Sequence, residues 1–397
     1  MAETGLLIIL PATVLRRPDP MEFDELLTPA LLLDLDVLER NLSRMQKKMS
    51  ELGPALRPHI KTHKCLDIAK KQRHLGAKGI TVSTFYEAEE FAKAGFDDIT
   101  WAFPIPPVYV PHAVRLAKEV TLRVLVDSPE AVQTLEDECR RAGGTVHVWL
   151  KIDCGNHRVG VDPASPRAED LVRVLSESSH LRFDGILSHS GHAYLGSTRE
   201  QILAVANQER DVMLEFANRM RRKGYPVAGI SIGSTPAMSV VENLDGISEV
   251  RPGNYCFYDN TMVSLGVCGV HDCALTMLAS VISHQAGASH FVVDAGALAL
   301  SKDQGATHIQ PQTGMGTIFE DYGGRRFYRG IALKTLSQEH GKAVADSPAI
   351  VEGRFHVGDR LRILENHSCL TVAHFDEYNV VRRDNIVDHW KILRGRA

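Results

Sequence analysis

Short apolar runs alternate with amphipathic windows along much of the chain. Nearly continuous runs of Val, Ile and Leu are typical of buried parallel strands, and apolar residues spaced by three or four positions are typical of helices that cover them. The predicted strands are Ala30–Leu33, Leu56–Ile60, Gly79–Ser83, Ile99–Phe103, Thr121–Val126, Val146–Ile152, Phe183–His189 and Ile230–Ile232. The predicted helices are Leu38–Leu52, Cys65–Leu75, Tyr86–Ala94, Val108–Lys118, Pro129–Ala142, Arg167–Ser176 and Arg199–Lys223.

This order of elements fits a (β/α)8 barrel, in which parallel strands close into a cylinder inside a ring of helices. An open, doubly wound sheet has a similar alternation. Its usual dinucleotide-binding signature, Gly-x-Gly-x-x-Gly after the first strand, does not occur in this chain. We therefore predict an α/β fold with a TIM-like barrel over residues 28–262.

The pattern changes after Asp259, and no long helical window follows Thr276. Short β-like runs separated by turns are typical of an all-β domain. The predicted strands are Leu278–His284, His290–Val293, Arg326–Tyr328, Asp359–Leu364 and Tyr378–Val381. We expect a C-terminal β domain over residues 263–397, joined by the N-terminal residues 1–27.

The charge is nearly balanced, with 45 basic and 49 acidic residues in a chain of 397. Such a chain lacks the basic surface that nucleic acids and anionic membranes require, so we expect neither as a partner. The apolar run Leu6–Leu10 ends at Pro11, lacks a basic flank and is too short to span a bilayer, which fits a strand better than a signal peptide. The seven cysteines form no Cys-x-x-Cys pair, which favours reduced thiols in the cytoplasm.

Lys61 lies in the segment Arg57-Pro58-His59-Ile60-Lys61-Thr62, between a predicted strand and the helix that follows it. In barrel enzymes this edge holds the active site. A lysine at the surface is usually a solvated cation. In an active site its amine can instead form a Schiff base with a carbonyl compound.

Titratable side chains also follow the other predicted strands. Arg158 follows the strand ending at Ile152, and His189, His192 and Tyr194 follow the strand ending near Leu187. Loops are polar in any protein, which accounts for some of these residues. The grouping of histidines with arginines at strand ends favours a functional site over that simpler explanation.

Gly233-Ser234-Thr235-Pro236 follows the last predicted strand and precedes a short helical segment. Backbone N–H groups and hydroxyl side chains at such a position favour a phosphate group. The same residues are equally suitable for an ordinary helix cap. The sequence alone leaves both interpretations open.

His367 and Cys369 stand two positions apart in the predicted β domain. Residues at that spacing face the same side of a strand, so we expect the imidazole and the thiol to lie together. Such a pair suits a divalent metal, zinc first, with water or substrate completing the shell. A buried cysteine beside a surface histidine is the simpler alternative. Glu339-His340 and His374-x-Asp376 are further candidates for the metal or its surroundings.

Five segments together, in this order and spacing, resemble the D-serine dehydratase and D-threonine aldolase family of fold-type III pyridoxal phosphate enzymes, whose barrel is like that of alanine racemase. The resemblance extends from about Thr28 to the C-terminus. The segments are Arg57-Pro58-His59-Ile60-Lys61-Thr62, Asp153 to Val161, Gly233-Ser234-Thr235-Pro236, Arg251-Pro252-Gly253-Asn254-Tyr255 and Asn366-His367-Ser368-Cys369.

The resemblance implies a role for each matching residue. Lys61 would bind pyridoxal 5'-phosphate as a Schiff base, Arg158 would lie near the cofactor ring, and His367 and Cys369 would bind a divalent metal (Zn, or Mn or Mg). The residues implied to hold the phosphate or to line the cofactor and substrate side are Gly233, Ser234, Thr235, Tyr194, Asn254, Tyr255 and Asp259. Members of the family are typically homodimers whose active site the partner chain completes.

The resemblance implies a lyase that acts on small D-3-hydroxy amino acids. Lys61, His367 and Cys369 would then be catalytic. Dehydration of D-serine or D-threo-3-hydroxyaspartate is the leading expectation, because His-x-Cys resembles the dehydratase branch, whereas a carboxylate is the usual second ligand in the aldolase branch. Retro-aldol cleavage to glycine and an aldehyde is the alternative. A racemase and a cofactor carrier without turnover are further alternatives, and the predicted β domain argues against the carrier.

Overall fold

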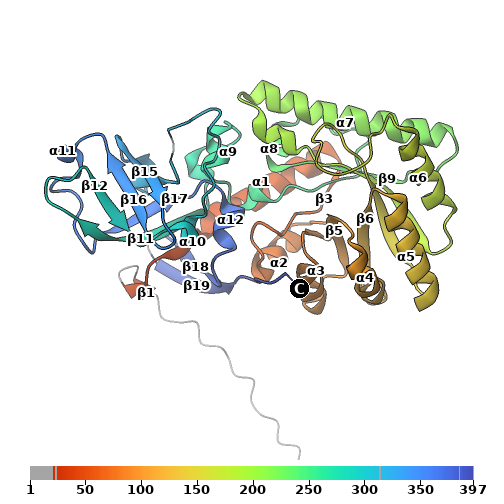
Figure 1. Ribbon diagram of the computed structural model, residues 1–397, viewed down its shortest axis with the longest axis horizontal. Helices are drawn as coiled ribbons and strands as arrows, with labels where there is room; N and C mark the ends of the chain where they lie inside the picture. The colour runs from red at the N-terminus through yellow and green to blue at the C-terminus, as the bar shows by residue number, and fades with distance from the viewer. Residues whose placement is uncertain (1–20, 23–24, 313, 384, 397) are drawn as a thin grey trace, which may run out of the picture.

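The computed structural model describes residues 21–22, 25–312, 314–383 and 385–396, so the strand expected at Leu6–Leu10 lies outside the described residues. Figure 1 shows two domains side by side, a barrel surrounded by helices and a strand-rich domain. The expected combination of an alanine racemase-type barrel with a β domain is confirmed. No helix among the described residues is long and apolar enough to cross a membrane.

The barrel is an eight-stranded, parallel sheet with the order β3-β10-β9-β8-β7-β6-β5-β4. A parallel bridge between His59 and Thr81 joins its two ends, and the amide of Ile60 donates to the carbonyl of Thr81 at 2.9 Å. The strands are β3 (Ala55–Leu56), β4 (Ile80–Val82), β5 (Asp98–Pro104), β6 (Thr121–Val126), β7 (Val146–Lys151), β8 (Leu181–Leu187), β9 (Gly229–Ile232) and β10 (Glu249–Val250).

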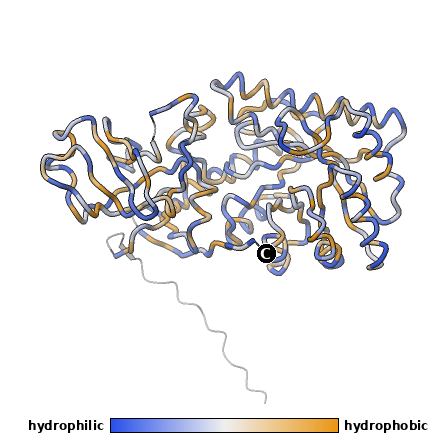
Figure 2. Tube along the Cα trace, viewed as in Figure 1, coloured by the Kyte–Doolittle hydropathy of each residue, from blue (hydrophilic) through white to orange (hydrophobic). Residues whose placement is uncertain are grey.

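Helices cover the outside of this sheet (Figure 1). Figure 2 shows that their traces alternate between hydrophobic and hydrophilic, as expected for helices with one face on a core. The helices of the barrel are α2 (Leu66–His74), α3 (Phe85–Lys93), α4 (Val110–Leu116), α5 (Pro129–Ala142), α6 (Pro166–Glu177), α7 (Arg199–Arg222) and α8 (Thr235–Val240).

The prediction that Ala30–Leu33 forms a strand of the barrel was wrong. Strand β2 (Ala30–Asp34) lies in the other domain, antiparallel to β11 (Leu275–His284) and parallel to β18 (Glu377–Arg382). Its leucines are buried on both faces of that sheet, which gives the same apolar run as a barrel strand. The remaining place in the barrel belongs to β10, which has only two residues and gives no such run.

The strand-rich domain contains an 11-stranded sheet with the main order β1-β19-β18-β2-β11-β12-β16-β15, and its β17 pairs with β11 and β13. All strands predicted for this domain coincide with or overlap one of its strands. Its remaining elements are β1 (Met21–Glu22), β12 (His290–Val293), β13 (Thr317–Asp321), β14 (Arg326–Phe327), β15 (Ile331–Leu336), β16 (Gly341–Ala345), β17 (Arg360–Leu364), β19 (Asn385–Lys391), α9 (Asn260–Ser264), α10 (Ala297–Leu300), α11 (Pro348–Val351) and α12 (Ser368–Val372).

Helix α1 (Leu35–Leu52) connects the two domains. The Asp34 side chain caps its start by accepting from the amide of Val37 at 3.1 Å, a contact that contributes about 1 kcal/mol in typical helices. Its buried residues recur at helical spacing, and Leu38 and Leu42 belong to the core that runs through both domains. The helix therefore fixes the strand-rich domain against the barrel.

A series of ion pairs connects the strands at the amino-terminal end of the barrel. Arg57 bonds Glu249 at 2.7 Å and Asp98 at 2.6 Å, and Arg123 bonds both Asp98 and Asp184, the latter at 2.6 Å. Arg57 is almost fully buried, so its charge is stable only with both partners in place. In barrels this end contributes to stability, and the opposite end carries the chemistry.

Candidate active site

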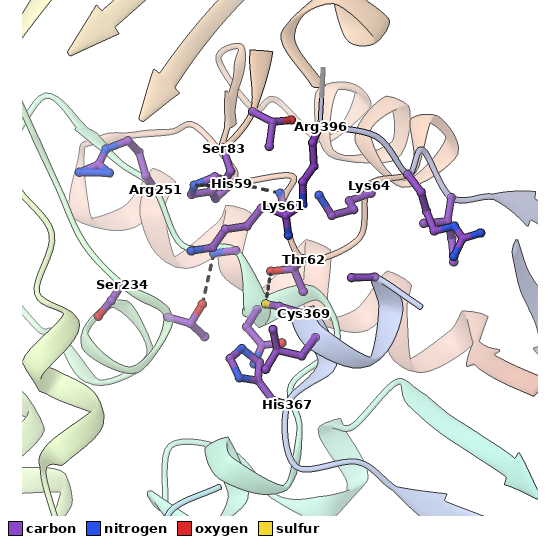
Figure 3. Close-up of a pocket in the computed structure, with 18 of the residues that line it drawn as sticks. His59, Lys61, Thr62, Lys64, Ser83, Ser234, Arg251, His367, Cys369 and Arg396 are labelled. Atoms are coloured by element: carbon purple, nitrogen blue, oxygen red, sulfur yellow. Dashed lines mark hydrogen bonds between the residues drawn. The ribbon is translucent and has the colours of Figure 1, made fainter. Parts of the chain in front are cut away.

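A cavity of about 1110 Å³ lies at the carboxyl end of the barrel strands, and residues of both domains line it (Figure 3). The barrel contributes loops after β3, β4, β7, β8, β9 and β10. The strand-rich domain contributes the start of α12 and the segment that follows β19. The cavity is therefore at the end of the barrel where catalytic residues are found in this fold.

Lys61 lies in a tight turn after β3, in which the amide of Lys64 donates to the carbonyl of Ile60 at 2.7 Å. Lys64 forms an ion pair with the fully buried Glu87, which also completes a capping box at the start of α3. Lys61 has no carboxylate partner in the part of the chain that the structure describes. The turn thus supplies one paired lysine and one amine that is free to react in the cavity.

Two histidines line the cavity near Lys61. Burial first, and then the charge of Lys61, hold the pKa values of His59 and His189 well below the usual range for histidine. The side chain of His189 contacts the carbonyl of Gly233 at 3.1 Å, and that of His59 contacts the Ser83 hydroxyl at 3.5 Å. Both imidazoles are therefore neutral near pH 7 and add no positive charge beside the amine.

Ser234 and Thr235 line the same cavity at the start of α8. Ser234 occupies the N-cap position without a side-chain capping bond, and its hydroxyl lies 3.3 Å from that of Ser190. Gly233 precedes it with a φ of 109°, which glycine adopts without strain. Ser234 therefore does not act as an ordinary side-chain cap of α8. Its hydroxyl lines the cavity instead.

The other residues expected at the cofactor divide into two groups. Arg158, Tyr194 and Asn254 line the cavity, whereas Gly233 and Tyr255 do not. The phenol of Tyr255 is buried in the core, where it accepts a hydrogen bond from Gln72 at 3.0 Å. Its side chain therefore does not reach a ligand in the cavity, because the short helix at 254–256 turns it towards α2.

Arg251 lines the cavity as well, although no role was predicted for it. It donates to the Ser231 hydroxyl at 2.7 Å and to the carbonyl of Ser188, and no salt bridge joins it to a carboxylate among the described residues. Burial lowers the pKa of its guanidinium to about 10, so it is still a cation at neutral pH. Its position after a strand was visible in the sequence, but its direction into the cavity was not.

His367 and Cys369 do come together, but the predicted reason was wrong. They do not share a strand: His367 is the N-cap residue of α12, and Cys369 lies in the first turn of that helix. The imidazole and the thiol are close enough to interact, and the Cys369 sulfur lies 3.1 Å from the Thr62 hydroxyl of the barrel. A helix start therefore places the pair on the cavity wall.

Charges around this pair favour a thiolate. Burial opposes the change, but the hydrogen bond and charge of His367, with a contribution from Lys61, lower the pKa of Cys369. Burial likewise opposes the change at His367, whose contacts with Asp303 and Cys369 raise its pKa to about 11.

Asp303 is a residue that the sequence analysis missed. Its Oδ2 lies 2.9 Å from Nδ1 of His367, and its Oδ1 accepts from the amide of Gly305 at 2.7 Å. Histidines that bind metals commonly donate their other ring nitrogen to a carboxylate in this way. No spacing rule connects residues 303 and 367, so only the folded structure reveals this contact.

A nitrogen and a sulfur donor on a cavity wall suit a borderline divalent metal. No group of three or more His, Cys, Asp or Glu side chains that could hold a metal occurs among the described residues. The remaining positions would fall to water or substrate, as in a catalytic metal site. Of the further candidates, Glu339 and His340 are exposed at a turn away from the cavity, and Asp376 pairs with Arg394 at 2.6 Å.

Asp259 lies behind the cavity wall rather than in the lining, where it was expected. Its carboxylate accepts from Asn254 at 2.6 Å and from the amide of Ser368 at 3.1 Å. The Ser368 hydroxyl donates in turn to Glu365 at 2.7 Å. Asp259 thus links the loop expected at the cofactor to the turn that carries His367 and Cys369.

Comparison with known proteins agrees with this architecture. Residues 33–261 match the model of the alanine racemase N-terminal domain, and residues 274–381 match that of a putative serine dehydratase domain. D-threo-3-hydroxyaspartate dehydratase of Delftia sp. (strain HT23) is 40% identical over 373 residues, which cover 93% of this chain and 97% of the relative. D-serine dehydratase of Dictyostelium discoideum is 34% identical, with 93% and 97% covered.

The solved structure of the Delftia enzyme superposes with a TM-score of 0.89 at 39% identity, over 94% of this chain and 99% of that chain. Another structure of that enzyme, with a Cys-to-Ala substitution, is described as a metal-free form. A 3-hydroxy-D-aspartate aldolase of Paracoccus denitrificans matches at a lower identity of 28%. The chain therefore belongs to the pyridoxal phosphate-dependent family of D-serine and D-threo-3-hydroxyaspartate dehydratases, which joins an alanine racemase-type barrel to a serine dehydratase domain.

Proposed function

We propose that the protein removes water from a D-3-hydroxy amino acid of the D-serine or D-threo-3-hydroxyaspartate type, with pyridoxal phosphate and a divalent metal. The products are ammonia and a 2-oxo acid. The observation that carries the proposal is that Lys61 from the barrel and the pair His367 and Cys369 from the strand-rich domain line one cavity. The names of the two dehydratases that match almost the whole chain support the same reaction.

The cavity provides for each part of the cofactor. The free amine of Lys61 would bind the aldehyde carbon of the cofactor. The Ser234 hydroxyl, which makes no capping bond to α8, would hold the cofactor phosphate together with Thr235. The other residues proposed at the cofactor are Gly233 through its backbone, Arg158, Tyr194, Asn254 and the newly identified Arg251. When bound, pyridoxal phosphate supplies an electron sink for negative charge that develops at the substrate Cα.

His367 and Cys369 would hold the metal, with zinc proposed first and manganese or magnesium as the alternatives. The donor atoms support this assignment, because an imidazole nitrogen and a cysteine sulfur on one cavity wall are ligands that a borderline divalent metal prefers. When bound, the metal supplies Lewis acidity that eases departure of the substrate β-hydroxyl. Asp303 would orient the imidazole, and Asp259 would keep the turn at Ser368 in register with Asn254.

The residues of the chain then divide the reaction between them. Once the substrate amine has taken its place on the cofactor, the released amine of Lys61 would accept the proton from Cα, since no carboxylate among the described residues competes for it. The Cβ–O bond breaks, and the departing hydroxide takes up that proton to become water. The released 2-amino-2-alkenoic acid tautomerises and hydrolyses in solution to ammonia and the 2-oxo acid. His59 and His189, held neutral by burial, keep the surroundings of Lys61 polar without adding charge.

We further propose that the protein is a homodimer of the cytoplasm, with no nucleic acid or membrane as a partner. Apolar side chains near the cavity support a second copy: Leu195, Leu298 and Leu370 are 72%, 48% and 43% exposed in the single chain, and Leu370 lines the cavity. A reducing compartment is supported by the seven cysteines, all of which are free thiols in the structure.

Product analysis tests the proposed reaction. The purified protein, with pyridoxal phosphate and zinc, is incubated with D-serine or D-3-hydroxyaspartate, and amino acids and 2-oxo acids are quantified. Equal amounts of ammonia and pyruvate or oxaloacetate support dehydration. Glycine with formaldehyde or glyoxylate would instead establish retro-aldol cleavage. Parallel reactions with Cys369→Ala, and with the L-isomers, control for non-specific chemistry of the cofactor.

A further inference from the structure

The C-terminal segment Lys391–Arg396 leaves the strand-rich domain and returns to the barrel, where Figure 1 shows the C-terminus beside α3. Backbone hydrogen bonds hold it there: the amide of Leu393 donates to the carbonyl of Lys64 at 2.7 Å, and the amide of Ile392 donates to that of Asp376 at 2.7 Å. The side chains of Ile392 and Leu393 are buried. The segment is therefore a fixed part of the cavity rim.

Arg394 and Gly395 determine the position of Arg396. Arg394 forms an ion pair with Asp376 at 2.6 Å and donates to the carbonyl of His374 at 3.2 Å. Gly395 lies flat against the ring of Tyr86, where an added Cβ would stand 2.6 Å from Cε1 of that ring. Only glycine permits this close approach, so the packing of Gly395 determines where Arg396 points.

Arg396 lines the cavity together with Lys61. Two other cations of the rim are neutralised, Lys64 by Glu87 and Arg394 by Asp376, whereas Lys391 has no ion pair within the described residues. Arg396 has no hydrogen bond and no ion pair within the described residues. In the view of Figure 3, Lys64 and Arg396 lie on one side of Lys61, and Ser234, with its phosphate-binding hydroxyl, lies on the other.

The side chains that line the cavity carry more positive charge than a substrate with one carboxylate requires. The lysines and arginines in the lining are Lys61, Lys64, Arg158, Arg251, Lys391, Arg394 and Arg396, and Asp376 is its only carboxylate among the described residues. A guanidinium matches a carboxylate through two parallel hydrogen bonds. A cation that the cofactor phosphate does not require therefore provides a place for a second substrate carboxylate.

We propose that Arg396 binds the β-carboxylate of a dicarboxylic 3-hydroxy amino acid and makes the enzyme prefer 3-hydroxy-D-aspartate to D-serine. This inference rests on the proposed function and assigns the substrate class of that site. The substituent at Cβ is a carboxylate in one substrate and a hydrogen in the other. A charge-assisted contact to that carboxylate therefore changes the two specificity constants unequally.

The test compares kcat/KM for both substrates in the wild type, Arg396→Ala and Arg396→Lys. We expect Arg396→Ala to lower the ratio of the dicarboxylate to D-serine by about 10- to 100-fold, the range for loss of a hydrogen bond to a charged group. Arg396→Lys keeps the charge without the planar fork and restores part of the ratio. Gly395→Ala moves the same guanidinium and should lower the ratio too, while Arg140→Ala, on the exposed face of α5, should leave it unchanged.

Equal losses with both substrates would overturn the proposal, because they would mean that Arg396 acts on the cofactor or on anions in general. Calorimetry with the holoenzyme separates this question from the reaction. Succinate should bind the wild type more tightly than propionate, and Arg396→Ala should abolish that difference. If the wild type turned over neither amino acid, the proposed function would fail, and this binding comparison would still decide the role of Arg396. An unchanged preference for succinate in the variant would refute it.

Discussion

The carboxylate of Asp303 offers the sharpest test of the metal pair, because it contacts the imidazole of His367. Its Oδ2 accepts from Nδ1 of His367 at 2.9 Å, and its Oδ1 accepts from the amide of Gly305 at 2.7 Å. A carboxylate only accepts hydrogen bonds, so it keeps the ring proton on Nδ1. When a metal displaces the proton from the other ring nitrogen, that nitrogen supplies the lone pair for binding.

Asp303→Asn changes this contact with little change in size. The amide has one acceptor oxygen where the carboxylate had two, so either His367 or Gly305 faces an NH2 group instead. Loss of such a supporting contact lowers metal affinity by about 10- to 100-fold, or about 1.4 to 2.7 kcal/mol. The two side chains are 29% and 36% exposed, so water replaces part of the contact. We therefore expect about 10- to 30-fold for Asp303→Asn and the upper end of the range for Asp303→Ala.

The assay titrates zinc into metal-free protein that retains pyridoxal phosphate, with calorimetry for affinity and the cofactor absorbance as a measure of an intact barrel site. Asp170→Asn is the matched control, since Asp170 is an exposed residue of α6 with a loose ion pair at 3.7 Å. Zinc binding by Asp303→Asn within about threefold of the wild type would show that the carboxylate does not orient the imidazole. Equal loss of zinc and cofactor would show unfolding rather than loss of orientation.

Three further changes probe the rest of the account. Lys61→Ala should abolish both activity and the absorbance of covalently held cofactor, and a band that persists at full intensity would mean that another amine holds it. Cys369→Ala should remove activity and bound zinc but keep the cofactor, because Lys61 is untouched; zinc retained at full occupancy would place the metal elsewhere. Arg57→Met should lower the free energy of unfolding by about 3 to 5 kcal/mol, because it leaves Glu249 buried without its partner. Urea denaturation measures this, and a loss below about 1 kcal/mol, the range of an exposed ion pair, contradicts the buried network.

The sequence predicted the barrel where each strand is a long apolar run between turn residues. Strands such as Thr121–Val126 are buried on both faces, so their composition alone identifies them. The same signal misassigned Ala30–Leu33, because a strand in the middle of the other sheet is equally buried. It also missed Glu249–Val250, where a buried glutamate paired with Arg57 replaces an apolar residue.

Candidate site residues were recognisable in the sequence where a reactive or polar side chain directly follows a predicted strand. Lys61 and Ser234 follow strands and do meet in one cavity. Tyr255 shows the limit of this reasoning, since a 3-10 turn directs its ring into the core. Asp303 and Arg396 show another limit. Asp303 meets His367, and Arg396 joins the cavity lining, only through the fold, and their local surroundings in the sequence carry no signal of either.

A lysine of the barrel and a histidine–cysteine pair of the strand-rich domain should serve one substrate at one site. Crystals grown with pyridoxal phosphate and zinc test it directly through the anomalous difference map at the zinc edge. We expect a zinc peak bonded to both His367 and Cys369, with cofactor density continuous with Lys61 in the same cavity and its phosphate at Ser234. A zinc peak away from that pair, or cofactor density that ends short of Lys61, would show that the two domains do not form one site.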